Sequence, residues 1–115
     1  MRSLGFQAER YAAYYLRDQG YKILAQNFHS RFGEIDIIAT ERETLVFVEV
    51  KMRSSRVFGT PLEAITYSKL QKMQKTAYYF LTIRNYKDVP FRFDAIAIKL
   101  EKNQKIINHV KNITL

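Results

Sequence analysis

Three charged residues in two largely apolar segments have types and spacing that suit metal-assisted chemistry. Asp36 lies within EIDIIAT (34–40), and Glu49 and Lys51 end LVFVEVK (45–51). Charges buried without partners are costly, so these residues should pair with one another or with a cation. Two adjacent carboxylates repel each other, which favours a divalent cation such as Mg²⁺. The alternative is a structural ion pair between Lys51 and either carboxylate.

Both segments are predicted to be neighbouring strands of one sheet. They are rich in β-branched residues and are separated by a short polar connector. Side chains alternate along a strand, so Asp36 is expected to share a face with Glu34 and Ile38. Antiparallel pairing of the two segments would then bring Asp36 close to Glu49.

The other elements follow from apolar spacing and turn residues. A helix is predicted over 3–17 with Gly20 as its stop signal. A second helix is predicted from Thr60 to about Arg84, with a break near Thr66. Extended segments are predicted over 21–28, 34–40, 45–51, 91–100 and 106–111, with a turn over 29–33. The order α-β-β-β-α-β plus a C-terminal strand indicates an α/β fold with a mixed central sheet flanked by helices.

Length and composition indicate a single domain over residues 1–115. The chain is 47% apolar and has no cysteine, which excludes disulfides, cysteine-ligated zinc and a cysteine nucleophile. Its first ten residues do not resemble a signal peptide, and no apolar run approaches the ~20 residues of a membrane helix. We therefore expect a cytoplasmic protein with no membrane association.

The charge balance favours a polyanionic partner, with DNA as the leading expectation. Lys and Arg number 19 against 11 Asp and Glu, a net charge of +8. The basic residues expected to contact a phosphate backbone are Lys51, Arg53, Arg56, Lys69, Lys72 and Lys75. A solvated basic surface is the alternative. The aromatic clusters Tyr14-Tyr15 and Tyr78-Tyr79-Phe80 are interpreted as helix packing or a homodimer face.

The charged motif also carries a family resemblance. Asp36, twelve intervening residues and then Glu49-Val50-Lys51 resemble the D-x(n)-(D/E)-x-K signature of the restriction-endonuclease-like superfamily. More narrowly, GEID (33–36) with FVEVK (47–51) is similar to the YraN-like family of small bacterial predicted endonucleases, whose layout resembles archaeal Holliday-junction resolvases. Further matching positions are Gly5, Glu9, Ala12, Lys69, Ala77 and residues 92–94. Where the superfamily usually has a proline, this chain has Ile35.

The resemblance implies a restriction-endonuclease-like nuclease domain and a role for each site residue. Asp36, Glu49 and the Val50 carbonyl would hold Mg²⁺ or Mn²⁺. Lys51 would orient and polarise the water that attacks the phosphodiester. Glu9, on the first helix, corresponds to a carboxylate that completes the site in resolvase-like members. The implied catalytic residues are thus Asp36, Glu49, Lys51 and Glu9.

Three of these assignments have structural alternatives. Glu9 lies at the edge of an apolar helical stripe, where it could instead be a solvated residue paired with Arg10 or Arg2. Glu34 is either a supporting residue for the metal ligands or a solvated strand-end carboxylate. Lys69 is either a phosphate or active-site contact, or a lysine that extends its amine out of the core edge.

Three functional interpretations follow. The first is a metal-dependent endonuclease acting on DNA, including branched or structured DNA. The second is a nucleic-acid-binding module of nuclease fold with little or no cleavage. The third is a structural or partner-docking domain whose charges form an ion-pair network. Asp94, beside Arg92 on one strand face, is interpreted as a structural ion pair in all three.

Overall fold

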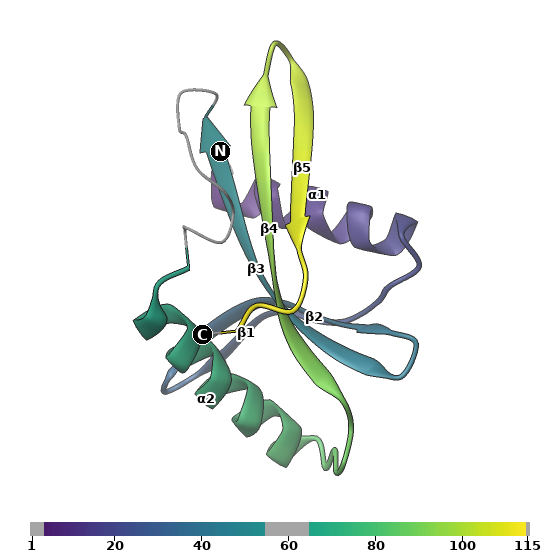
Figure 1. Cartoon of the computed structure of the whole chain (residues 1–115), viewed down its shortest axis with the longest axis vertical. Helices are drawn as coiled ribbons and strands as arrows, with labels where there is room; N and C mark the ends of the chain where they lie inside the picture. The colour runs from purple at the N-terminus through teal and green to yellow at the C-terminus, as the bar shows by residue number, and fades with distance from the viewer. Residues whose placement is uncertain (1–3, 55–64, 115) are drawn as a thin grey trace.

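The order of elements in the computed structural model, which describes residues 4–54 and 65–114, is the predicted one (Figure 1). The elements are α1 (Leu4–Asp18), β1 (Lys22–Ser30), β2 (Gly33–Glu41), β3 (Thr44–Ser54), α2 (Tyr67–Ile83), β4 (Phe91–Glu101) and β5 (Gln104–Val110). Helix α1 ends as expected at Gly20, which has a φ of +94° and is followed by a hydrogen bond from Tyr21 N–H to Leu16 O.

The five strands form one mixed sheet in the order β1-β2-β3-β4-β5. Strands β1, β2 and β3 form an antiparallel meander, and β4 pairs antiparallel with β5. Strands β3 and β4 are parallel, so the chain must cross over between them, and α2 lies in that connection. The predicted mixed α/β architecture is confirmed.

The two helices pack on opposite faces of this twisted sheet (Figure 1). The helix residues in the two cores are Ala8, Ala12, Ala13 and Leu16 from α1, and Leu70, Met73, Ala77 and Phe80 from α2. Strand β3 is buried on both faces: Val48 and Val50 pack on the α1 side, whereas Leu45 and Phe47 pack on the α2 side. By this alternation Glu49 faces α2.

Strand β2 departs from regular alternation at Asp36. Ile35 and Ile38 both pack on the α2 side, whereas Ile37 packs on the α1 side. In the neighbouring β1, Asn27 has a left-handed φ of 52°. The β1–β2 register pairs the residues on either side of Asn27 with those on either side of Asp36, but it does not pair Asn27 with Asp36. The predicted strict alternation is therefore wrong at this point. Such irregularities re-aim side chains, often next to active sites.

Two predicted boundaries also change. The turn between β1 and β2 is shorter than expected, because the strands extend to Ser30 and from Gly33. Helix α2 begins at the expected break, where the Thr66 side chain accepts a hydrogen bond from Lys69 N–H. The helix start predicted at Thr60 lies outside the described residues.

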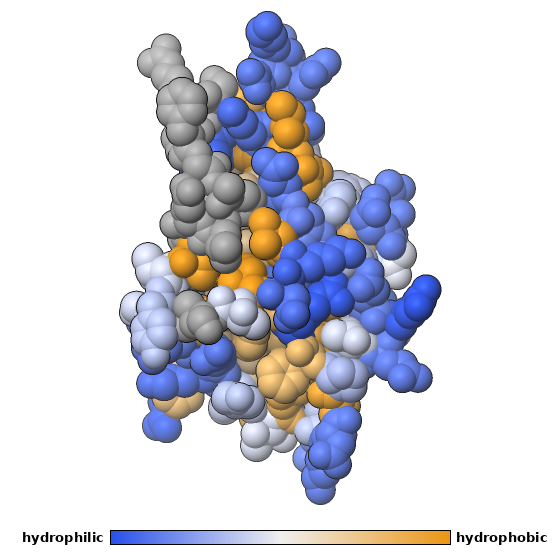
Figure 2. Space-filling model, in the orientation of Figure 1, coloured by the Kyte–Doolittle hydropathy of each residue, from blue (hydrophilic) through white to orange (hydrophobic). Residues whose placement is uncertain are grey.

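Polar residues lie at the tip of the hairpin that β4 and β5 form. Figure 2 shows hydrophilic residues at its tip, where Lys102 and Asn103 form the turn.

In the part of the chain that the structure describes, no helix is long and apolar enough to cross a membrane.

Candidate active site

The Asp36 carboxylate lies against the backbone of β3. Its Oδ2 accepts a hydrogen bond from Val50 N–H at 2.8 Å. The antiparallel pairing predicted for β2 and β3 is confirmed, with Ile37 opposite Val48. The recorded register ends at this pair, and the effect of the Glu49 charge on the pKa of Asp36 shows that the two carboxylates are close. The two acidic residues of the motif are thus brought together by adjacent strands.

Glu49 is a buried anion held by two lysines from different elements. Its Oε1 lies 3.4 Å from Lys51 Nζ and 3.3 Å from Lys69 Nζ. The side chain of Glu49 is 3% exposed, whereas that of Lys51 is 45% exposed. Its other oxygen, Oε2, is buried and has no hydrogen-bond partner among residues 4–54 and 65–114. The ion pairs therefore satisfy only one of its two oxygens.

The surroundings of Asp36 disfavour its ionised form. Burial, followed by the negative charge of Glu49, raises the pKa of Asp36 from its ordinary 3.8 to about 7. The hydrogen bond from Val50 and the charge of Lys69 act to lower this pKa, and the charge of Glu9 adds to the rise. Without a further cation, burial and the charge of Glu49 thus favour the protonated form of Asp36 more than in an ordinary aspartate.

Glu9 on α1 is half-buried and close enough to act electrostatically on Asp36. Over residues 4–54 and 65–114, however, no three histidine or acidic side chains converge as a group that could hold a metal ion. The role of Glu9 as a third carboxylate ligand stays a prediction.

The donor atoms around Asp36 suit a hard divalent cation. Such a cation prefers carboxylate oxygens and relieves the repulsion between neighbouring anions. A cation bound here would give Oε2 of Glu49 a partner and would offset the surroundings that raise the pKa of Asp36. The Val50 carbonyl stays the predicted third ligand, and the binding of Mg²⁺ or Mn²⁺ is itself still a prediction.

The other predicted DNA-contacting residues lie along the end of β3 and on α2. Lys72 and Lys75 are exposed on α2, and Lys75 Nζ lies 5.8 Å from the centre of the Phe32 ring. Arg53 is half-buried near the end of β3. Arg56 lies outside the described residues. Contact of these residues with DNA stays a prediction.

Glu34 has a partner of its own. Its Oε2 lies 3.2 Å from His29 Nδ1, across the β1–β2 ladder, and its side chain is 48% exposed. This contact supports a solvated strand-end carboxylate, and does not support the alternative in which Glu34 assists the metal ligands.

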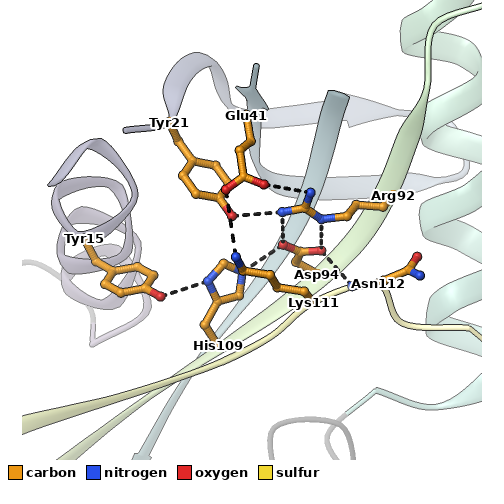
Figure 3. A network of polar contacts seen from close by, with 8 residues as sticks. All are labelled: Tyr15, Tyr21, Glu41, Arg92, Asp94, His109, Lys111 and Asn112. Atoms are coloured by element: carbon orange, nitrogen blue, oxygen red, sulfur yellow. Dashed lines mark hydrogen bonds and ion pairs between the residues drawn. The ribbon is translucent and has the colours of Figure 1, made fainter. Parts of the chain in front are cut away.

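A second charged cluster is buried on the α1 side of the sheet, around Asp94 (Figure 3). Asp94 Oδ1 accepts hydrogen bonds from Arg92 Nε and Asn112 N–H, both at 3.0 Å. Its Oδ2 lies 2.8 Å from His109 Nε2, and His109 Nδ1 lies 2.9 Å from the Tyr15 hydroxyl. Burial alone would raise the pKa of Asp94, but these donors hold it below its ordinary value. The cluster joins α1 to β4 and β5.

The same cluster extends to β2 through Arg92. This guanidinium donates hydrogen bonds to Glu41 Oε1 at 3.0 Å and to the Tyr21 hydroxyl at 2.9 Å. Burial raises the pKa of Tyr21 to about 12. The Arg92–Asp94 ion pair was predicted and is confirmed. The part played by His109 was missed, because its partner Tyr15 is 94 residues away along the chain.

Comparison with known proteins places this site in a widespread bacterial family. A protein-family sequence model described as "Uncharacterised protein family UPF0102" matches residues 8–98 of this chain. A UPF0102 protein of Syntrophomonas wolfei is 43% identical over 96% of this chain and 96% of its own length. A UPF0102 protein of Thermodesulfovibrio yellowstonii is 46% identical over 95% of this chain and 93% of its own. Another, from Psychromonas ingrahamii, is 47% identical over 84% and 78%.

Proposed function

The chain belongs to the uncharacterised protein family UPF0102, which agrees with the YraN-like resemblance, and we propose that it is a metal-dependent endonuclease that hydrolyses phosphodiester bonds of DNA. The family name assigns no activity. The proposal therefore rests on the chemistry of the site. It includes the proposal that this fold is related to that of the restriction-endonuclease-like superfamily.

The observation that carries the proposal is the unpartnered Oε2 of Glu49. A buried carboxylate oxygen without a hydrogen bond is expensive, and most native structures avoid it. Here two lysines approach Oε1, while Oε2 has no partner within the described part of the chain and the charge of Glu49 acts on the Asp36 carboxylate. A ligand site for a cation explains this arrangement, because the cation would satisfy the oxygen and offset the repulsion.

The residues of the site have separable tasks in this proposal. Asp36 and Glu49 would hold the cation, which when bound supplies Lewis-acid polarisation of the phosphate and acidifies a water molecule. Lys51, whose side chain is partly exposed, would position the attacking water and offset the charge that develops on the phosphate oxygens. Lys69 adds positive charge from α2 at the same carboxylate.

Two further features support DNA as the substrate. The net charge of +8 favours a polyanion, and the chain has no base-reading motif, so its binding should depend on phosphates.

A cytoplasmic location, where such a substrate is present, belongs to the same proposal. So does a homodimer formed through the exposed Tyr78 and Tyr79, which sedimentation velocity would test.

The structural alternative is supported by one specific observation, the contact of both lysines with Glu49. An ion-pair network accounts for Oε1. It does not account for the buried, unpartnered Oε2 or for a second carboxylate placed where ionisation is disfavoured. A DNA-binding module without cleavage would leave the same two facts unexplained.

The test is a cleavage assay with linear duplex, single-stranded and four-way-junction DNA, with and without Mg²⁺ or Mn²⁺. We expect cleavage only with the divalent ion, and loss of cleavage in Asp36→Asn. Glu34→Gln is the matched control, because it also neutralises a carboxylate on β2 but one paired with the exposed His29. DNA binding without cleavage of any substrate would favour the binding module, and neither binding nor cleavage would favour the structural domain.

A further inference from the structure

The outer face of α1 carries a basic and aromatic groove that the proposed chemistry does not use. A cavity of about 160 Å³ is lined by Arg10, Ala13, Tyr14, Arg17 and Gln26. Arg10, Tyr14 and Arg17 follow one another at spacings of four and three residues, so they lie on one side of the helix. Tyr14 is 61% exposed, so its ring covers little of the core and is open to a ligand.

This groove adjoins the candidate active site. Gln26 on β1 is paired with Ile37 on β2, the residue that follows Asp36. On α1, Arg10 follows Glu9, whose charge acts on Asp36. The groove thus lies near Asp36 on the α1 side of the sheet, whereas Glu49 faces α2 on the other side.

The chemistry of the groove distinguishes two kinds of contact. Guanidinium groups form bidentate hydrogen bonds with phosphates, and an exposed phenol ring offers a flat face for base stacking. Tyr14 also lines a larger cavity of about 440 Å³, which includes Asp18 and Lys105. The carboxylate of Asp18 would repel a phosphate, so the phosphates are placed at the two arginines and the base at Tyr14.

We propose that this groove binds an unpaired DNA strand on the α1 side of the sheet, with Arg10 and Arg17 on its phosphates and Tyr14 stacked on a base. The choice of DNA rests on the proposed function. A single strand is favoured over a duplex, because paired bases are already stacked and offer no free face to the tyrosine.

The test measures binding without cleavage, in EDTA, by fluorescence anisotropy of a labelled single strand and of the matching duplex. Tyr14→Ala should weaken binding of the single strand roughly tenfold and leave duplex binding within about twofold. Tyr14→Phe should bind like the wild type, because the ring is kept. Tyr86→Ala is the matched control, since Tyr86 is 37% exposed, follows α2 and has no proposed part in DNA binding or dimerisation, so it should have no effect.

The arginines give an independent readout. Arg10→Gln and Arg17→Gln should each reduce the slope of log affinity against log salt by about 0.7 for the single strand. Far-ultraviolet circular dichroism would establish that each variant is folded.

The proposal is overturned by either of two results. One is a Tyr14→Ala variant that binds the single strand as tightly as the wild type. The other is an equal loss of single-strand and duplex binding in that variant, which would assign the effect to general electrostatics or folding. Binding is measured in EDTA, where no metal-dependent cleavage takes place, so it is independent of the cleavage assay with divalent ions. A wild type that cuts no DNA in the cleavage assay but binds the single strand through Tyr14 would refute the nuclease and support the groove. A wild type that cuts DNA, together with a Tyr14→Ala variant that binds the single strand normally, would support the nuclease and refute the groove.

Discussion

Lys69 on helix α2 reaches across to β3 and places its Nζ 3.3 Å from Oε1 of Glu49. Lys51, two residues after Glu49, approaches the same oxygen at 3.4 Å. Two cations and one anion would be an ordinary surface network if all three were solvated, but Glu49 is 3% exposed. The position of Lys69 makes it part of the charge balance of the candidate site.

Asp36→Asn should stabilise the metal-free protein, by an amount that grows with pH. The pKa of Asp36 is raised from 3.8 to about 7 in the folded state, so below pH 4 the group is protonated in both states and costs nothing. Between pH 4 and 7 the unfolded chain ionises more readily, so wild-type stability falls, and above pH 7 the loss is constant. Asparagine avoids this loss and keeps an acceptor for Val50 N–H. We expect a gain of about 1 to 4 kcal/mol at pH 8 and little at pH 4.

Urea unfolding in EDTA at several pH values would measure this difference. Glu34→Gln, on the same strand but half exposed, should change the free energy of unfolding by less than about 0.5 kcal/mol at any pH. An Asp36→Asn variant that is less stable than the wild type at pH 8 would instead assign Asp36 a structural role.

Binding of Mg²⁺ or Mn²⁺ should release protons. A cation needs the ionised form of Asp36, whose pKa is raised to about 7, so binding at pH 6 should release up to about one proton. At pH 8 the group is already ionised and the release should approach zero. Calorimetry in buffers of different ionisation enthalpy measures this number directly. Binding with no proton release at pH 6 would mean that the cation is held elsewhere.

The fold could be predicted from the sequence because its signals are local. The apolar runs around Asp36 and Glu49 identified β2 and β3, and the short polar connector between them fixed their antiparallel pairing. The alternation along β3 also placed Glu49 correctly on the opposite face from Val48 and Val50.

What could not be predicted depends on backbone irregularity and on distant contacts. No pattern in β2 signals the break at Asp36, which accompanies the left-handed conformation of Asn27 on the neighbouring strand. The contact of Lys69 with Glu49 depends on how α2 packs, and the family resemblance alone pointed to it. The pairing of His109 with Tyr15 likewise needs the three-dimensional fold.

Asp94→Ala should destabilise the fold strongly, whatever the activity of the protein. The substitution leaves Arg92, His109 and Asn112 N–H without their buried acceptor, and loss of one partner of a buried ion pair costs about 3 to 5 kcal/mol. Chemical denaturation at pH 7 measures this loss, and Glu34→Ala serves as the exposed control. A change below about 1 kcal/mol would contradict the structural role of the cluster.

The same residue should contribute to acid unfolding. The pKa of Asp94 is lower in the folded state than in the unfolded chain, so its stabilisation is complete above about pH 4 and is lost as the pH falls through the lowered value. In Asp94→Asn this acid-dependent loss should be absent, and the free energy of unfolding should vary less between pH 5 and pH 2 than in the wild type. An unchanged pH profile would show that another group controls acid unfolding.

The last prediction separates the two lysines, which contact the same oxygen but should have different functions. In Lys51→Ala, cleavage should fall by about 10² or more, because the water loses its positioning group. Divalent-ion affinity should be kept or increase, because a competing positive charge leaves Glu49. In Lys69→Ala the pKa of Asp36 should rise, since Lys69 acts to lower it, so the pH midpoint of ion binding should move upward.

Calorimetric titration with Mg²⁺ and cleavage rates over a pH series distinguish these effects. Lys75→Ala, an exposed lysine on α2, is the control and should change neither the ion affinity nor its pH midpoint. A purely structural network makes the opposite prediction, because Lys51→Ala would then leave Glu49 poorly compensated and destabilise the fold by roughly 3 kcal/mol. If that loss is found in a wild-type background that binds no divalent ion, the charges serve stability, and the nuclease proposal fails.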